Sequence, residues 1–98
     1  MDVLERESDR TVVCQFKHYV EALCPEGGED FYTLTLTYTS TGDIVDKDSF
    51  KEYLNKFSSE KIYAEDLVAE VVKDFPFNVD RVEVSEIEEM GIKVVYES

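Results

Sequence analysis

The sequence predicts an α+β domain built as two strands, two helices and two further strands. Apolar residues recur at every second position in residues 11–39 and again in residues 82–96, which is the spacing of strands. In residues 50–75 they recur at intervals of three and four, which is the spacing of amphipathic helices. Consecutive strands separated by short loops pair antiparallel, so we expect one mainly antiparallel four-stranded sheet with both helices on one face.

Residues 11–22 and 31–39 are the first two predicted strands. One face of the first strand carries Cys14, Phe16, His18 and Val20. In the second strand Tyr32, Leu34, Leu36 and Tyr38 share one face, and four threonines occupy the other. Residues 24–30 contain one proline and two glycines, which is typical of a loop, so these strands should form a hairpin.

The helices and the last two strands follow. The first helix should bury Phe50, Tyr53, Leu54 and Phe57, with Asp46 or Asp48 as its N-cap. The second, of about three turns, should end at Pro76 and bury Leu67, Val68, Val71, Val72 and Phe75. Val82, Val84 and Ile87 indicate a third strand, and residues 92–96 a fourth, joined by a turn at residues 88–91. Two helices cover one sheet face, so the other should meet solvent or another subunit.

Length and charge limit the possible functions. The 98 residues fit one domain, which we assign to residues 11–98, after a charged lead-in at residues 1–10. Ten basic and 23 acidic residues give a net charge of −13, which repels phosphate backbones. No apolar run approaches the roughly 20 residues of a membrane span. The first ten residues lack the apolar region of a signal peptide, so we expect a cytoplasmic protein that does not bind membranes.

Cys24 is the candidate nucleophile. It lies in the glycine-containing loop, six residues before Asp30. A thiolate attacks carbon, and a nearby carboxylate can accept its proton or pass one to the substrate. The alternative is a small apolar residue beside a turn, which is what we expect of Cys14 within its strand. The two cysteines and the single histidine, His18, lack zinc-ligand spacing, so we expect no metal site.

Glu65 is a candidate binding residue at the start of the second predicted helix, beside Asp66. Carboxylates are favoured there by the helix dipole alone. A carboxylate can also accept two parallel N–H bonds from a guanine-like edge. His18 is interpreted as a surface or interface histidine rather than a catalytic base.

Four short motifs resemble those of a known family. They are Leu23-Cys24-Pro25, Asp30-Phe31, Ser49-Phe50-Lys51-Glu52-Tyr53 and Ala64-Glu65-Asp66. Their order and spacing over about residues 11–96 resemble the 7-cyano-7-deazaguanine reductase family, which has the tunnelling fold. The resemblance implies that Cys24 forms a covalent thioimide with the nitrile, Asp30 acts as general acid and base, and Glu65 anchors the base. It also implies a homo-oligomer with active sites between subunits, because proteins of this fold close their sheets into oligomeric barrels.

Three departures from the family pattern favour one group of its members over the others. Ala64 stands where the family has histidine, the cysteine loop is one residue shorter, and Asp48 replaces the first lysine of the motif associated with NADPH. These features favour the short reductase-like amidinotransferases of archaeosine synthesis, which add ammonia to a nitrile carried in tRNA and need no redox cofactor.

Two alternatives stay open. Ser49, Lys51 and Tyr53 are retained, as in an NADPH-dependent nitrile reductase of queuosine synthesis. The lost histidine and the acidic surface would also suit a non-catalytic family member. The charge of −13 opposes tRNA binding, so the choice between a free base and a base within tRNA stays open too.

Overall fold

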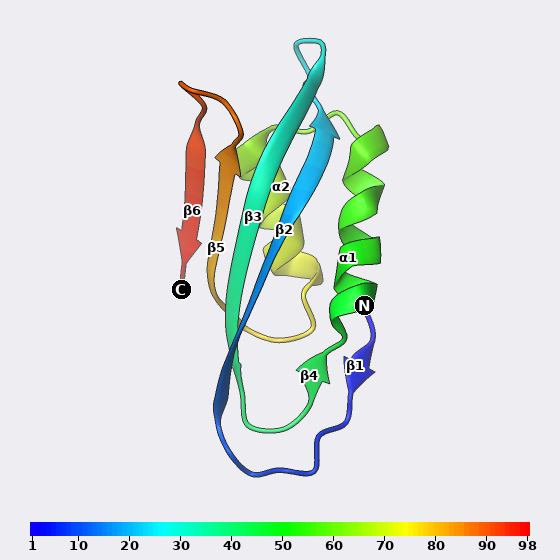
Figure 1. Cartoon of the computed structure of the whole chain (residues 1–98), viewed down its shortest axis with the longest axis vertical. Helices are drawn as coiled ribbons and strands as arrows, with labels where there is room; N and C mark the ends of the chain where they lie inside the picture. Colours follow the sequence, from blue (N-terminus) through cyan, green and yellow to red (C-terminus); the bar gives the residue numbers. More distant parts are fainter.

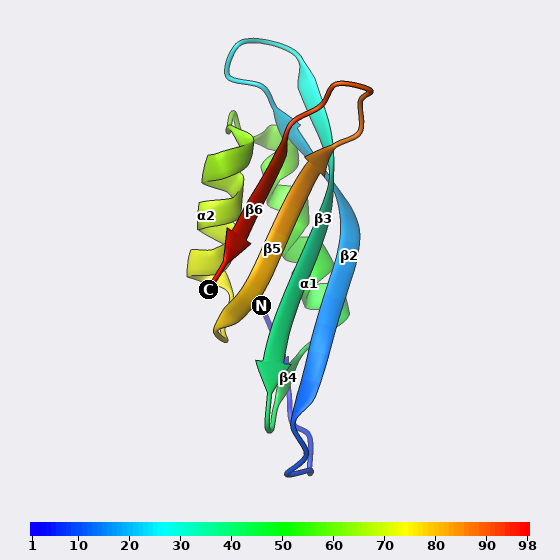
Figure 2. The same cartoon turned by 90° about the vertical axis from the view of Figure 1, so that its left-hand side faces the viewer.

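A computed structural model describes residues 1–98 and shows one twisted antiparallel sheet covered on one face by two helices (Figures 1 and 2). The sheet order is β2-β3-β5-β6, which confirms the predicted α+β class. The elements are β1 (Val3–Leu4), β2 (Val12–Leu23), β3 (Glu29–Ser40), β4 (Ile44–Val45), α1 (Lys47–Asn55), a 3₁₀ turn (Lys56–Ser59), α2 (Ala64–Asp74), β5 (Val79–Glu86) and β6 (Lys93–Glu97).

The long β2–β3 hairpin forms one half of the four-stranded sheet. Its pairing runs without a break from Val12 opposite Ser40 to Leu23 opposite Glu29. β2 therefore lies one residue later than predicted, and β3 extends beyond both of its predicted ends. The connecting loop is closed by the N–H of Cys24, which donates to the carbonyl of Gly28 over 2.9 Å. Gly27 and Gly28 have φ values of 113° and 84°, which residues with a side chain rarely adopt.

The core lies between the sheet and the helices. The predicted alternation in β3 is confirmed, because Tyr32, Leu34, Leu36 and Tyr38 are all buried beneath the helices. At the β4 end of the core the ring of Tyr38 packs edge-on against Phe75, with centroids 4.9 Å apart. The first helix is shorter than predicted. It ends at Asn55, and the following 3₁₀ turn keeps Phe57 fully buried.

Local residues mark the start of α1 and the end of α2. Asp46 is the N-cap residue of α1, although its side chain makes no capping hydrogen bond. In α2 the last helical residue is Asp74, and Phe75 is already extended with ψ of 132°. A residue before proline is disfavoured in the helical region, so Pro76 ends the helix as predicted.

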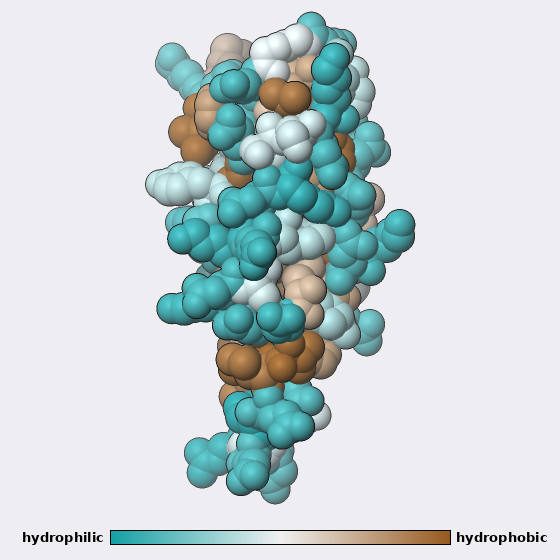
Figure 3. All heavy atoms as spheres, turned by 90° about the vertical axis from the view of Figure 1, so that its right-hand side faces the viewer, coloured by the Kyte–Doolittle hydropathy of each residue, from teal (hydrophilic) through white to brown (hydrophobic).

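The charged lead-in is partly structured. Val3 and Leu4 form β1, which pairs antiparallel with Ile44 and Val45 of β4. Figure 3 shows an apolar band at the height of these two strands, where Val3 and Leu4 remain about half exposed. Charge alternation in residues 1–10 gave no sign of this pairing, which depends on a strand 40 residues away. No helix is long and apolar enough to cross a membrane.

A polar contact joins the two helices. The hydroxyl of Tyr53 in α1 donates to Asp74 Oδ2 at the end of α2 over 2.6 Å, and Lys56 Nζ lies 3.4 Å from the same oxygen. The Tyr53 hydrogen bond, followed by Lys56, lowers the pKa of Asp74 below its ordinary value. A carboxylate with a depressed pKa contributes stability above its unfolded-state pKa, and this is lost as the pH falls through its folded-state pKa.

The β5–β6 turn is tightly packed. β5 ends at Glu86, so the predicted inclusion of Ile87 is wrong, although the Ile87 N–H still donates to the Phe31 carbonyl. The Glu86 N–H donates to the Ile92 carbonyl, which closes the turn. A Cβ built on Gly91 would lie only 2.5 Å from the Glu86 Cβ. The turn therefore requires glycine at residue 91.

We predict that Tyr53→Phe lowers the free energy of unfolding by about 1 kcal/mol at pH 7. The loss should shrink at acid pH, as the pH falls through the folded-state pKa of Asp74 and the carboxylate becomes protonated. Urea denaturation of wild type and variant at pH 7 and at acid pH measures the difference. A loss of the same size at both would contradict the assigned charge-assisted bond.

We also predict that Gly91→Ala lowers the free energy of unfolding by about 1–3 kcal/mol, because the added methyl group must displace Glu86. Gly42→Ala is the matched control, since a Cβ there meets nothing within 4 Å. Urea unfolding midpoints compare the two. Equal midpoints for the two variants would contradict this prediction, because they would show that the turn at Glu86 relaxes around the added methyl group.

Candidate functional site

The end of β2 and the start of α2 are held together by main-chain bonds. The Leu23 N–H donates to the Glu60 carbonyl over 2.9 Å, and the Ile62 N–H donates back to the Leu23 carbonyl over 3.0 Å. Cys24 follows Leu23, and α2 begins two residues after Ile62. The loop that carries Cys24 and the N-terminal turn of α2 therefore lie at the same end of the domain (Figure 1).

Asp30 faces the helices at this end. It lies opposite Ala22, which is fully buried on the helix side of the sheet. It also precedes the inward-facing Tyr32 by two residues, so it shares that face. Both Asp30 and Cys24 are half-buried. The Tyr32 hydroxyl donates a hydrogen bond of 3.2 Å to Asp30 Oδ2.

The pKa of the Tyr32 hydroxyl reflects the groups near it. Its pKa is raised far above the ordinary value, first by burial, then by the charge and hydrogen bond of Asp30, and then by Glu86 and Cys24. The hydroxyl therefore remains a hydrogen-bond donor at neutral pH. Asp30 contacts the buried hydroxyl directly, and Glu86 and Cys24 lie close enough for their charges to raise its pKa.

Glu86 was not among the candidate site residues that the sequence indicated. It lies opposite Tyr32 in the β3–β5 ladder and is half-buried. The alternation of Val82, Val84 and Glu86 was the available signal, because it puts Glu86 on the inward face. The site thus holds a second carboxylate, Glu86, in addition to Asp30.

Glu65 occupies the predicted place at the start of α2. It is exposed in the first turn, and its side chain makes no hydrogen bond or ion pair within the chain. Its role in binding stays a prediction. The preceding Ala64 is 2% exposed, so a buried methyl group stands at the start of the helix.

The other chemically reactive residues lie apart from Cys24. His18 is half-buried and borders a shallow groove between β2 and α1, together with Lys47 and Lys51. Six residues along a strand separate it from Cys24 by about 20 Å. Cys14 packs against the core. No three His, Cys, Asp or Glu side chains converge in a metal-binding arrangement.

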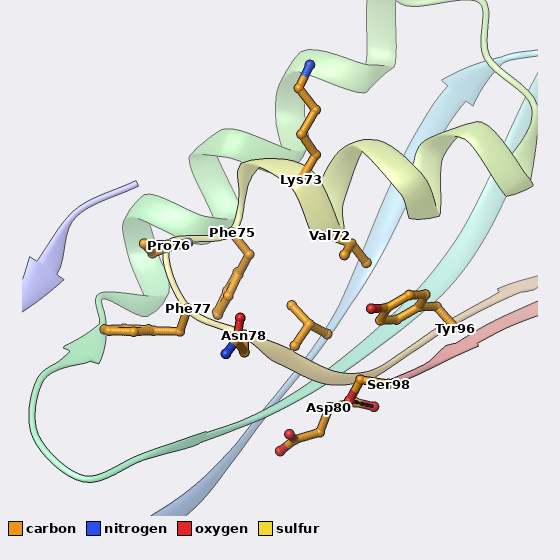
Figure 4. Close-up of a pocket in the computed structure, with 10 residues that line it drawn as sticks. Val72, Lys73, Phe75, Pro76, Phe77, Asn78, Asp80, Tyr96 and Ser98 are labelled. Carbon is orange, nitrogen blue, oxygen red and sulfur yellow. Dashed lines mark hydrogen bonds between the residues drawn. The ribbon is translucent and has the colours of Figure 1, made fainter.

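The largest cavity, of 760 Å³, lies elsewhere (Figure 4). It is bounded by the C-terminal end of α2, the loop to β5 and the end of the chain, where Tyr96 and Ser98 contribute. It contains none of the predicted site residues and lies at the opposite end of α2 from Glu65. Cavity size therefore does not identify the Cys24 site.

Comparison with known proteins gives the family. The model of the family described as QueF-like protein matches residues 29–87, which include Asp30, Glu65 and Glu86. Cys24 lies five residues before the matched segment. No curated protein sequence matches the chain.

The fold has a solved counterpart, the archaeosine synthase QueF-Like in its apo form. The two superpose with a TM-score of 0.72 at 22% identity, over 88% of this chain and 92% of the other. At this identity the match establishes the shared fold. Since the family model covers more than half of the chain, this protein belongs to the QueF-like family.

Proposed function

We propose that this protein is an amidinotransferase that converts the nitrile of a 7-cyano-7-deazaguanine group, carried in tRNA, to the amidine of archaeosine. Membership of the QueF-like family supports a role in 7-deazaguanine modification. The observation that carries the proposal is that the β2–β3 pairing puts Cys24 and Asp30 at the same end of the hairpin, where Asp30 accepts the hydrogen bond of the buried Tyr32 hydroxyl. A thiol beside a carboxylate is the pair that nucleophilic attack on a nitrile requires.

The first step would be addition of the thiol to the nitrile. The Cys24 sulfur bonds to the nitrile carbon, one carbon–nitrogen π bond breaks, and the electron pair moves to nitrogen. Asp30 takes the thiol proton and delivers it to that nitrogen, which gives a thioimide. No group leaves, so the adduct carries the full mass of the substrate.

The second step would be replacement of sulfur by ammonia. Ammonia adds to the thioimide carbon, the carbon–sulfur bond breaks, and the electron pair returns to Cys24. Proton transfer through Asp30 restores the thiol and releases the amidine. The overall reaction adds one ammonia to one nitrile without oxidation or reduction.

Glu65 would anchor the guanine-like edge of the base. Its carboxylate is exposed and has no partner within the chain, so it is free to accept two parallel N–H bonds. Its position at the surface also suits a base bound between subunits, where Glu65 and Cys24 could come from different copies of the chain.

The reductase alternative has weaker support. Of the three residues that resemble a cofactor motif, Tyr53 donates to Asp74 and Ser49 donates to the Asp46 carbonyl. Only Lys51 lacks an intrachain partner, and Asp48 adds a negative charge nearby. This set fits an anionic nicotinamide cofactor poorly. Addition of ammonia needs no such cofactor.

We predict that wild-type protein incubated with 7-cyano-7-deazaguanine, or with tRNA bearing it, gains the mass of the nitrile compound. Intact-mass spectrometry measures the gain, which Cys24→Ala should abolish. Cys14→Ala is the matched control and should retain it. No adduct on wild type with either substrate would refute the proposal and favour a non-catalytic family member.

The fate of the adduct separates the two chemistries. With ammonium present, the product should be heavier than the nitrile by one ammonia, and NADPH absorbance should stay constant. Nitrile-dependent consumption of NADPH would instead establish the reductase.

We also predict that the protein is a homo-oligomer in which further copies pair with the open edges of β2 and β6. The outward sheet face carries the exposed apolar residues Val13, Tyr19 and Val95, and unpaired edges of this length favour added strands. Light scattering should give a multiple of the chain mass, and this mass should fall as the salt concentration is lowered, because the acidic subunits then repel one another more strongly. A stable monomer at micromolar concentration would contradict this prediction.

A further inference from the structure

We propose that Tyr32 is a positioning residue whose hydroxyl holds the Asp30 carboxylate in place for proton exchange with Cys24. This inference rests on the proposed function, because it assigns Asp30 its role in the thioimide step. Nothing in the family resemblance assigned a function to Tyr32.

The geometry gives Asp30 a single anchor. The Tyr32 hydroxyl is the one donor to its side chain, over 3.2 Å to Oδ2, and Asp30 is in no ion pair. Oδ1 therefore has no hydrogen-bond partner within the chain and is available for a proton. Tyr32 is 1% exposed, so its ring is fixed by the core and its hydroxyl has a defined position.

The surroundings explain why an anchor is needed. Asp30 is the first inward-facing residue of β3, and the strand pairing fixes its backbone but not the rotation of its carboxylate. Glu86, opposite Tyr32, adds a second negative charge, and no cation pairs with either carboxylate. The Tyr32 hydrogen bond is therefore the one side-chain contact in the chain that fixes the orientation of the Asp30 carboxylate.

The missing histidine strengthens the assignment. Ala64, where the resembled family has histidine, presents only a methyl group and can neither donate a hydrogen bond nor exchange a proton. Tyr32 is the side chain that donates to Asp30, and it can do so throughout the neutral range, since burial and the adjacent carboxylate raise its pKa. The hydroxyl thus orients the Asp30 carboxylate.

The test compares Tyr32→Phe with Tyr38→Phe. Tyr38 lies on the same strand and face, is also 1% exposed, and its hydroxyl oxygen accepts the Val45 N–H over 2.9 Å. It lies six residues from Tyr32, about 20 Å along the strand. Each variant removes one buried, hydrogen-bonded hydroxyl, so the pair separates a cost in stability from an effect on the site.

We expect Tyr32→Phe to slow adduct formation with 7-cyano-7-deazaguanine by at least about tenfold. Its pH–rate profile should also differ from that of wild type, because the proton exchange between Asp30 and Cys24 is altered. Tyr38→Phe should match wild type in both. In an Asp30→Asn background, Tyr32→Phe should have little further effect. Tyr32→His, which again offers a donor, should recover part of the rate.

Alkylation of Cys24 by iodoacetamide, followed by peptide mass mapping, gives a readout that needs no nitrile. If wild type forms no adduct but Tyr32→Phe changes the pH profile of alkylation and Tyr38→Phe does not, the proposed function fails and the role of Tyr32 stands. If wild type forms the adduct and the two phenylalanine variants behave alike in both assays, the role of Tyr32 is refuted and the function stands. An effect of Tyr32→Phe that persists in the Asp30→Asn background would also refute the role of Tyr32.

Discussion

The site depends on two main-chain hydrogen bonds at Leu23. They join the end of β2 to the segment between the helices, at Glu60 and Ile62. Without them the loop bearing Cys24 and the first turn of α2 would be separate surface features. Such main-chain contacts are insensitive to side-chain identity, so the same end of the fold can hold different chemical groups. The fold supplies the arrangement, and the side chains at this end supply the chemistry.

The chemistry at this end is dominated by carboxylates. Asp30 accepts a hydrogen bond from the buried Tyr32 hydroxyl, Glu86 lies opposite Tyr32 in the β3–β5 ladder, and Glu65 lies exposed at the helix start. No lysine or arginine forms an ion pair with any of these carboxylates. Three of the ten basic residues, Lys56, Arg81 and Lys93, are instead bound in ion pairs elsewhere. A site of this kind suits a ligand rich in N–H donors, such as the guanine-like edge of a deazaguanine. It offers little to a phosphate group.

Local periodicity was a good guide to the fold because each element buries one face. The alternation in β3 and the helical stripe of α2 each identify a buried surface from neighbouring residues alone. Elements that depend on distant partners were not predictable in this way. Val3 and Leu4 become a strand only because β4 lies beside them, and Phe57 is buried by a 3₁₀ turn although the spacing indicated a continuous helix.

For the candidate site too, some features could be predicted from local sequence and others depended on distant partners. The sequence by itself determined which groups could react, because Cys24, Asp30 and Glu65 stand in short motifs whose residue types define their chemistry. Only the tertiary structure decided their surroundings. Tyr32 and Glu86 are 54 residues apart and meet because β3 and β5 pair in one register, which brings a second carboxylate to the hydroxyl bound by Asp30. Register is set by the packing of whole strands, so no local pattern could reveal it.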